Sequence, residues 1–130
     1  MKELWEAPWG KALSNTVYKE VDPDFYDDEY SMEYVWDGSF YKAYENKGND
    51  IFLCCYFSEE KGIHLGFYVE TPDGGNEISN NLELPEGWDK TIDDGRETLK
   101  GIELKGKTEI DIESLIKLAE EAISILSKTL

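Results

Sequence analysis

The sequence predicts an α+β fold in which an antiparallel meander sheet of about four to six strands packs against a C-terminal amphipathic helix. Apolar residues recur with a helical period near the C-terminus, they alternate with polar residues between positions 30 and 70, and Gly- and Asn-containing turns separate the alternating runs. A chain of 130 residues is long enough for one hydrophobic core. We therefore expect residues 1–130 to form a single acidic domain.

The N-terminal segment predicts a short helix through Leu13. Pro8 is expected at the first helical position, because proline has no backbone N–H and the first helical turn leaves such groups unpaired. Gly10 and Asn15 weaken the helical pattern. The segment is therefore ambiguous between a helix and a loop.

A hairpin is predicted at Asp37-Gly38, which lies between the strand-like runs 30–36 and 39–45. Asp-Gly favours a two-residue type I′ turn, since both positions take positive φ. The resulting register sets Glu33 opposite Lys42, an attractive cross-strand pair. It gathers five side chains on the opposite face, which we expect to be the core face: Met32, Tyr34, Trp36, Tyr41 and Ala43.

Two further strands follow. Residues 50–57 are apolar on both faces, which is typical of a central strand. The adjacent Cys54 and Cys55 should therefore point to opposite faces of the sheet. Residues 63–69 alternate and complete a second hairpin, which ends by Glu70.

The pattern weakens between residues 77 and 107. Asp93-Asp94-Gly95 is a turn signal between two short runs, 88–92 and 96–104. One more hairpin is therefore expected there.

The C-terminal helix is the clearest element. Thr108-Glu109-Ile110-Asp111 matches a helix-capping pattern, and the helix should run to about Ser127. One arc of this helix holds seven apolar residues: Ile112, Leu115, Ile116, Ala119, Ala122, Ile123 and Leu126. Leu118 and Ile125 widen the stripe on one flank. Two explanations stay open, a deep groove within the domain or a contact with a partner such as a homodimer.

The charge is strongly negative. There are 29 acidic residues against 13 basic ones, a formal charge of −16, and Arg96 is the single arginine. Binding to a phosphate backbone needs clustered Lys and Arg, so we do not expect nucleic acid as a direct ligand. An anionic membrane would repel this surface for the same reason.

The chain shows no sign of export. No apolar run approaches the roughly 20 residues of a membrane span, and the first residues lack the apolar core of a signal peptide. The two adjacent cysteines cannot form an ordinary disulfide framework, which fits a reducing compartment. We therefore expect a cytoplasmic location.

One short pattern suggests an enzyme. Pro72-Asp73 followed by Glu103-Leu104-Lys105 resembles the PD-(D/E)XK nuclease superfamily, and the resemblance implies carboxylates that hold a divalent metal and a lysine that assists water attack. Glu45-Asn46-Lys47 and Glu59-Glu60-Lys61 also fit the second half of the pattern. A chain this rich in Glu, Asp and Lys produces such matches readily.

Cys55 and His64 form a second candidate. If Ser58 pairs with Ile63, the side chains of Cys55 and His64 lie on the same face of the sheet, close enough for a thiolate and its base.

Metal ligation is less well supported. Two cysteines on opposite faces and one histidine cannot build a zinc site. Asp22, Asp24, Asp28 and Glu33 occupy EF-hand positions, but Asp27 stands where that loop needs glycine. We expect no metal and no cofactor.

The sharpest anomaly is the segment from Glu20 to Asp37, which holds eight acidic residues and no base, interleaved with aromatic residues. Two explanations stay open: a solvated face that keeps the protein soluble, or carboxylates around aromatic side chains that combine attraction for a basic partner with rigid contact area. The expected partner-binding residues are Asp22, Asp24, Phe25, Tyr26, Asp27, Asp28, Glu29, Tyr30, Glu33 and Trp36.

The leading hypothesis is therefore a non-enzymatic binding module: an acidic inhibitor, immunity-type protein or nucleic-acid mimic that occupies a basic surface of a nuclease, toxin or DNA-binding protein. A dedicated acidic secretion-type chaperone, similar in size, acidity and general outline, is a second class. A metal-dependent nuclease-like enzyme is the third.

Overall fold

The structure is a computed structural model that describes residues 3–22, 24, 26–28, 38–58, 62–90, 98–102 and 111–129. Its strands are β1 (Lys19–Glu20), β2 (Tyr26–Asp28), β3 (Gly38–Asn46), β4 (Asn49–Ser58), β5 (Gly62–Glu70), β6 (Asp89–Lys90) and β7 (Thr98–Ile102). Its helices are α1 (Glu3–Leu13), α2 (Glu77–Asn80) and α3 (Ile112–Thr129).

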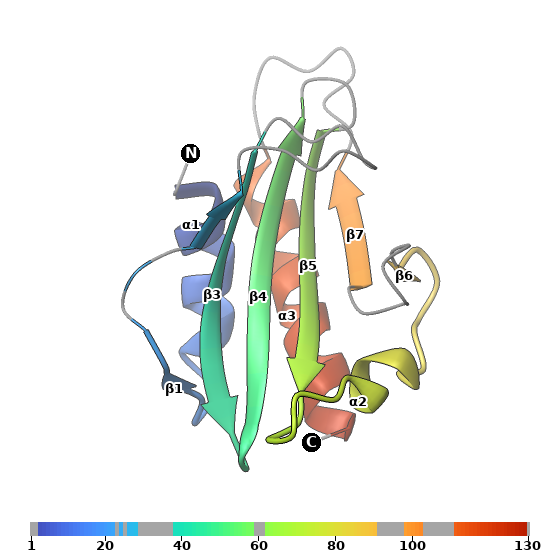
Figure 1. Cartoon of the computed structure of the whole chain (residues 1–130). Coiled ribbons are helices and arrows are strands. Elements are labelled where there is room, and N and C mark those ends of the chain that lie inside the picture. The colour runs from blue at the N-terminus through green and yellow to red at the C-terminus, as the bar shows by residue number, and fades with distance from the viewer. Residues whose placement is uncertain are drawn as a thin grey trace.

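These seven strands form one antiparallel sheet in the order β1-β3-β4-β5-β7-β6, and β2 also pairs with β3 (Figure 1). The predicted α+β class with an antiparallel sheet and a C-terminal helix is confirmed. The described strands outnumber the expected four to six because β1, β2 and β6 have only two or three residues each. Such short strands leave little periodicity in the sequence.

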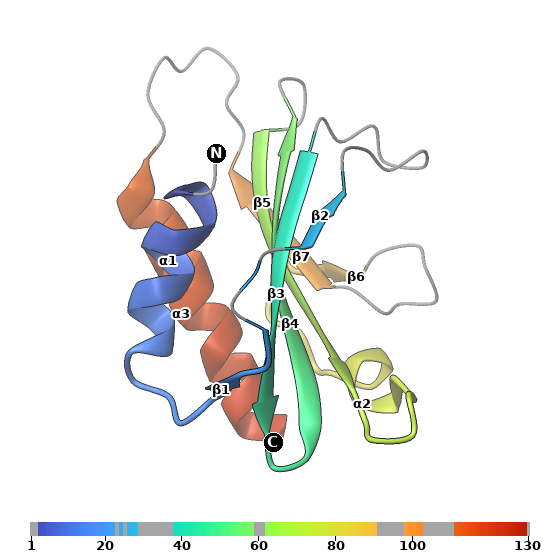
Figure 2. The ribbon, with the colours of Figure 1, turned by 60° about the vertical axis from the view of Figure 1, so that its left-hand side comes forward.

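The helices α1 and α3 lie on the same side of the sheet (Figure 2). We call this side the helix face and the opposite side the far face. Along β4, Leu53 and Cys55 belong to the core under the helices, whereas Cys54 and Tyr56 belong to a smaller cluster on the far face. The predictions of a central strand and of cysteines on opposite faces are therefore confirmed.

Helix α1 is tied to the sheet through two buried tryptophans. Trp5 Nε1 donates a hydrogen bond to the Leu53 carbonyl at 2.8 Å, and Trp9 Nε1 donates one to the Cys54 carbonyl at 3.2 Å. Pro8 lies inside this helix and not at its first position, so that prediction is wrong. Burial of Pro8 and both indoles outweighs the backbone hydrogen bond that Pro8 lacks.

Helix α3 starts later than the capping pattern predicts. Asp111 is its N-cap: Ser114 donates its backbone N–H to Asp111 Oδ1 at 3.3 Å and its hydroxyl to Asp111 Oδ2 at 2.6 Å. Thr108 lies outside the described residues. None of the described helices, α3 included, combines the length and hydropathy that crossing a bilayer requires.

The surplus apolar flank of α3 is accounted for within the chain. Leu118 and Ile125 are only 8% and 6% exposed, and both belong to the main core. Because α3 packs against α1 as well as the sheet, it needs a wider apolar stripe than a helix on a sheet alone. The groove explanation therefore holds, and these two side chains offer little surface to a second copy.

The predicted hairpin at Asp37-Gly38 is wrong in register. Tyr41 lies opposite Tyr26 of β2, whereas the predicted turn would place Tyr34 there. Lys42 forms an ion pair with Glu20, Nζ to Oε1 at 2.7 Å. The other residues of the predicted partner strand, Met32, Tyr34 and Trp36, lie outside the described residues, as does Glu33.

A two-residue turn does occur one hairpin later, at Lys47-Gly48. Both residues take positive φ, 53° and 82°, as a type I′ turn requires. This turn sets the long β3–β4 pairing from Gly38 opposite Phe57 to Asn46 opposite Asn49. The pairing places Tyr41 and Ala43 on the far face, where Ala43 is buried and Tyr41 packs against the smaller core cluster. The opposite face of β3 also packs against a core, since Phe40 and Tyr44 contact the main core under the helices.

The expected third hairpin is confirmed as a pair of strands. Asp89 of β6 lies opposite Leu99 of β7, and Lys90 lies opposite Thr98. The proposed turn residues, 93–95, lie outside the described residues.

Helix α2 was not anticipated. Its Ser79 is fully buried, and the hydroxyl accepts the Val69 N–H at 2.5 Å and donates to the Val69 carbonyl at 3.2 Å. This bonding holds α2 against the end of β5.

Gly101 has a specific packing reason. A Cβ at this position would overlap the imidazole ring of His64, which lies directly opposite on β5. We expect Gly101→Ala to lower the free energy of unfolding by about 1–3 kcal/mol through overpacking. Urea denaturation checks the value, and adding His64→Ala should restore much of the loss. Equal destabilisation with and without His64 would contradict this explanation.

A candidate binding surface on the far face of the sheet

An apolar row crosses the far face from the edge of the sheet to its centre. It consists of Val21, Ala43, Phe52 and Tyr68. The backbone N–H of Val21 donates to the Ala43 carbonyl at 3.0 Å, and Ala43, Phe52 and Tyr68 lie opposite one another on successive strands. The rings of Phe52 and Tyr68 stack, with centroids 4.4 Å apart. Tyr68 is buried, whereas Val21 is 53% exposed, so the row is open to solvent at the edge.

A carboxylate row runs beside it on the same face. It consists of Glu45, Asp50 and Glu70, which lie directly opposite one another on β3, β4 and β5. Glu45 and Asp50 are exposed and Glu70 is half-buried. Neighbouring strands are about 5 Å apart, and like charges placed directly opposite each other destabilise a sheet. Lys19 of β1 lies opposite Glu45 and is the one base at this end of the row within the described strands.

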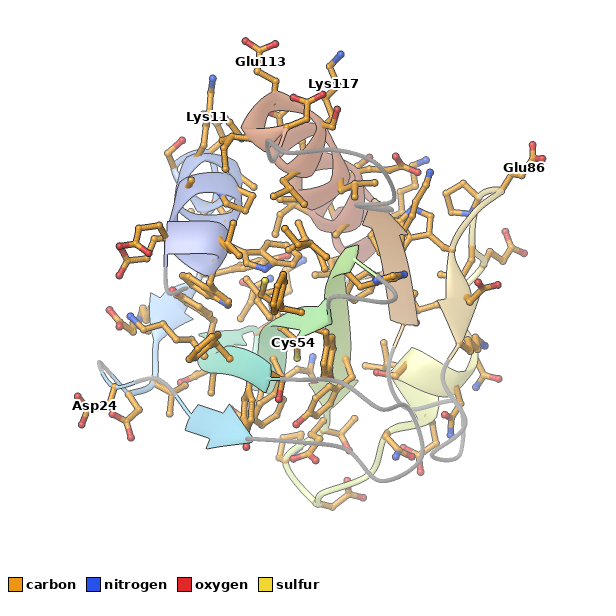
Figure 3. The ribbon with its side chains drawn as sticks, turned by 90° about the horizontal axis from the view of Figure 1, so that it is seen from above. Lys11, Asp24, Cys54, Glu86, Glu113 and Lys117 are labelled. Atoms are coloured by element: carbon orange, nitrogen blue, oxygen red, sulfur yellow. The ribbon has the colours of Figure 1, made fainter. Side chains whose placement is uncertain are left out.

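The chain next to these rows forms an exposed edge. Val17 is 82% exposed, which is high for a large apolar side chain, and Asp24 is exposed. Figure 3 shows Asp24 at one edge of the molecule, whereas Lys11, Glu113 and Lys117 project from the outer side of the helical layer. Exposed apolar and acidic side chains therefore occur together at the β1–β2 edge.

The predicted partner-binding segment follows this edge in part. Asp22 and Asp24 lie on the described chain between β1 and β2, and the Asp24 N–H donates to Asp22 Oδ1 at 3.0 Å. Three predicted residues, Tyr26, Asp27 and Asp28, form β2, although their side chains are outside the described part. The remaining predicted residues fall outside the described residues altogether: Phe25, Glu29, Tyr30, Glu33 and Trp36.

Only the first half of the pattern that resembles the PD-(D/E)XK superfamily lies within the described residues. Asp73 follows the end of β5, where the Thr71 hydroxyl and then the Gly75 N–H hold the pKa of its carboxyl below the ordinary value. Ile102, which precedes Glu103, lies opposite Ile63 at the other end of β5. A strand rises by about 3.3 Å per residue, so the two halves of the pattern approach the sheet roughly 20 Å apart. Glu103 and Lys105 themselves lie outside the described residues.

The Cys55–His64 pair is contradicted by the register. Cys55 lies opposite Leu65 and packs in the core under the helices, whereas His64 lies opposite Tyr56 on the far face. The expected register was wrong by one residue, since Ser58 pairs with Gly62, and one residue moves a side chain to the other face. Burial also raises the pKa of the Cys55 thiol to about 12, the opposite of what a nucleophile needs.

Two buried groups that lose a proton at high pH, the Cys55 thiol and the Tyr44 hydroxyl, make the fold sensitive to alkaline conditions. Burial raises the pKa of Cys55 to about 12, from 9.0, and burial together with Glu20 raises the pKa of Tyr44 to about 12, from 10.0. A group whose pKa is raised by folding stabilises the fold below its unfolded pKa and loses that contribution as pH rises toward the folded value. We therefore expect the free energy of unfolding to fall from about pH 9 upward, and to fall less steeply in Tyr44→Phe.

Thiol labelling provides an independent check at neutral pH. Both cysteines should react with a thiol probe far more slowly than free cysteine, in proportion to the unfolded population. A rate equal to that of free cysteine would contradict the burial of Cys54 and Cys55.

Metal and cofactor chemistry finds no support in the described residues, where no three His, Cys, Asp or Glu side chains are placed to hold a metal ion. The expectation of no metal and no cofactor stays a prediction, because Glu33 and the Asp28 side chain are outside that part.

A groove of about 580 Å³ lies between the chain after α2 and the end of α3. Its lining residues are Asn81, Glu83, Leu84, Pro85, Ile125 and Lys128. One carboxylate and one ammonium group are too few for acid–base catalysis or metal binding, so we assign no chemistry to this groove.

The carboxylate row was missed at the level of sequence, although the signal was present. The Lys47-Gly48 turn alone puts Glu45 opposite Asp50, and closing the next hairpin at Ser58 and Gly62 puts Asp50 opposite Glu70. The acidic residues that stand out in the sequence are those in contiguous runs, whereas these three carboxylates come from three different strands.

The fold and this surface define an acidic α+β domain with a mixed apolar and acidic sheet face. No protein-family model matches the chain, and comparisons with curated proteins and with solved structures also found no match.

Proposed function

We propose that this protein is a non-enzymatic binding module, an acidic inhibitor or mimic that occupies a basic surface of a partner protein. The observation that carries the proposal is the carboxylate row, Glu45, Asp50 and Glu70, next to the apolar row on the far face, which is exposed at its edge residue Val21. The two rows supply charge complementarity and apolar contact area on one surface.

The energetics favour a functional explanation of the carboxylate row. Opposed like charges work against folding, and a surface needs no such arrangement to stay soluble. A lysine or arginine from a partner would place an opposite charge beside Asp50, at the centre of the carboxylate row.

Affinity capture from native lysate tests the proposal. The double variant Glu45→Gln/Asp50→Asn should lose a basic partner, with affinity lowered roughly tenfold to a hundredfold, or about 1.4–2.7 kcal/mol. Glu113→Gln/Glu120→Gln is the matched control, because it removes the same charge from exposed positions on α3. Raising the salt from about 0.1 to 1 M should release the partner from the wild-type protein.

Equal loss with the α3 control would show that only net charge matters. An acidic partner, or binding that survives high salt, would contradict the proposal directly.

A second candidate is the dedicated secretion-type chaperone. The antiparallel sheet and the C-terminal helix α3 favour it, because they make up the general outline on which this candidate rests. A chaperone would hold an extended client mainly through backbone and apolar contacts. Client capture that is insensitive to salt and to the Glu45/Asp50 variant would select this candidate over the first.

A further inference from the structure

We infer that the outer edge of β1 receives an extended, lysine- or arginine-containing segment of the partner as an added antiparallel strand. This inference rests on the proposed function and specifies how the partner docks. It assigns the edge segment, residues 17–22, as the place where the partner backbone binds.

Pairing within the described residues involves one edge of β1. β1 pairs with β3 on one side, and no strand in the described part of the chain pairs with its other side. Val21 donates its N–H to Ala43, so in the alternation of an antiparallel ladder Glu20 directs its own N–H and C=O away from β3. Those outward groups are the template that strand addition uses.

The side chains of the edge segment fit a strand with alternating character. Val17, Lys19 and Val21 occur at every second position, and the two valines are 82% and 53% exposed. Apolar side chains on an added strand would cover the valines. The apolar row then continues from Val21 across the sheet, so the new contact joins the surface already proposed to bind the partner.

Charge decides between the candidate occupants. A second copy of this chain would bring another −16 to an edge that carries Asp22 and Asp24 beside Lys19, while Glu20 is paired with Lys42. An extended basic segment meets the same carboxylates with opposite charge. The occupant is therefore a basic partner segment and not a homodimer partner.

A synthetic peptide of alternating valine and lysine, capped and labelled with a fluorophore, is a suitable probe. Its binding to the full-length protein is followed by fluorescence anisotropy. The matched probe carries N-methyl groups on three consecutive central amides, which removes backbone donors from both edges while keeping every charge and side chain. We expect the methylated peptide to bind at least about tenfold more weakly.

Protein variants and hydrogen exchange locate the contact. Val17→Ser/Val21→Ser should weaken binding, whereas Ile112→Ser, which alters another exposed apolar residue, should not. The backbone amide of Glu20 should exchange more slowly when the unmethylated peptide is bound.

Three results would overturn the inference: methylation that changes affinity by less than about twofold, unchanged exchange at Glu20, or no binding of the peptide. If the Glu45/Asp50 variant still abolishes capture of the natural partner in those cases, the proposed function stands and only the strand-addition geometry fails.

Discussion

Replacing Trp9 with alanine is expected to lower the free energy of unfolding by about 3–5 kcal/mol, enough to unfold a domain of ordinary stability. Trp9 is fully buried between α1 and the sheet, and its indole N–H bonds to the Cys54 carbonyl. The truncation removes the largest fully buried side chain of the core and leaves a cavity that the surrounding α3 and β4 side chains cannot fill. Urea denaturation followed by circular dichroism measures the loss.

Two further variants of α1 test separate contributions to stability, the hydrogen bond of Trp9 and the helix propensity at position 10. Trp9→Phe keeps most of the packing and removes the hydrogen bond, so it should cost clearly less than the alanine variant. Gly10→Ala should stabilise the protein by about 0.5–1 kcal/mol, because a Cβ there meets no atom within 4 Å and alanine favours a helix. If Trp9→Ala costs less than about 1 kcal/mol, α1 does not hold the core together as the contacts indicate.

The strong local signals in the sequence were sufficient for the fold class. The apolar run of β4 and the helical period of α3 each bury a continuous surface, so the pattern carries the information. α1 was ambiguous because Pro8 and Gly10 both oppose a helix locally. Tertiary contacts decide that segment, since Trp5 and Trp9 reach carbonyls on β4 that lie more than forty residues away in sequence.

Register was the main error at the level of sequence, and its consequences are large. Asp37-Gly38 and Lys47-Gly48 are both credible two-residue turns, and only the second is one. Because side chains alternate along a strand, the error at the Ser58 turn produced a false Cys55–His64 pair. A site made of side chains from several strands can be predicted only when the register of those strands is known. The apolar stripe of a single helix can be predicted from its period alone.

The candidate surface also depends on the register of the strands. The sequence indicated acidic residues interleaved with aromatic ones, and it placed them in one contiguous segment. The sheet assembles the same combination from separate strands, with Asp50 beside Phe52 on β4 and Glu70 beside Tyr68 on β5. The combination of acidic and aromatic side chains could therefore be predicted from the sequence, whereas the strand pairing that brings Asp50 and Glu70 together could not.

Asp50→Asn is expected to stabilise the free protein while weakening its binding to a basic partner. Asp50 lies between Glu45 and Glu70, so the neutral amide removes the central negative charge of the row. Solvent screening limits the gain in the free energy of unfolding to about 0.5 kcal/mol. The same substitution removes the carboxylate at the centre of the proposed contact, and the dissociation constant should rise roughly tenfold.

Opposite signs in these two measurements distinguish a binding surface from a structural one. Asp50→Glu is the control that keeps the charge, and it should retain both the wild-type stability and the salt-dependent binding. Thermal unfolding gives the first quantity and titration with the captured partner gives the second. If Asp50→Asn destabilises the protein, the row is held by contacts that serve folding, and the repulsion that motivates the proposed function is absent.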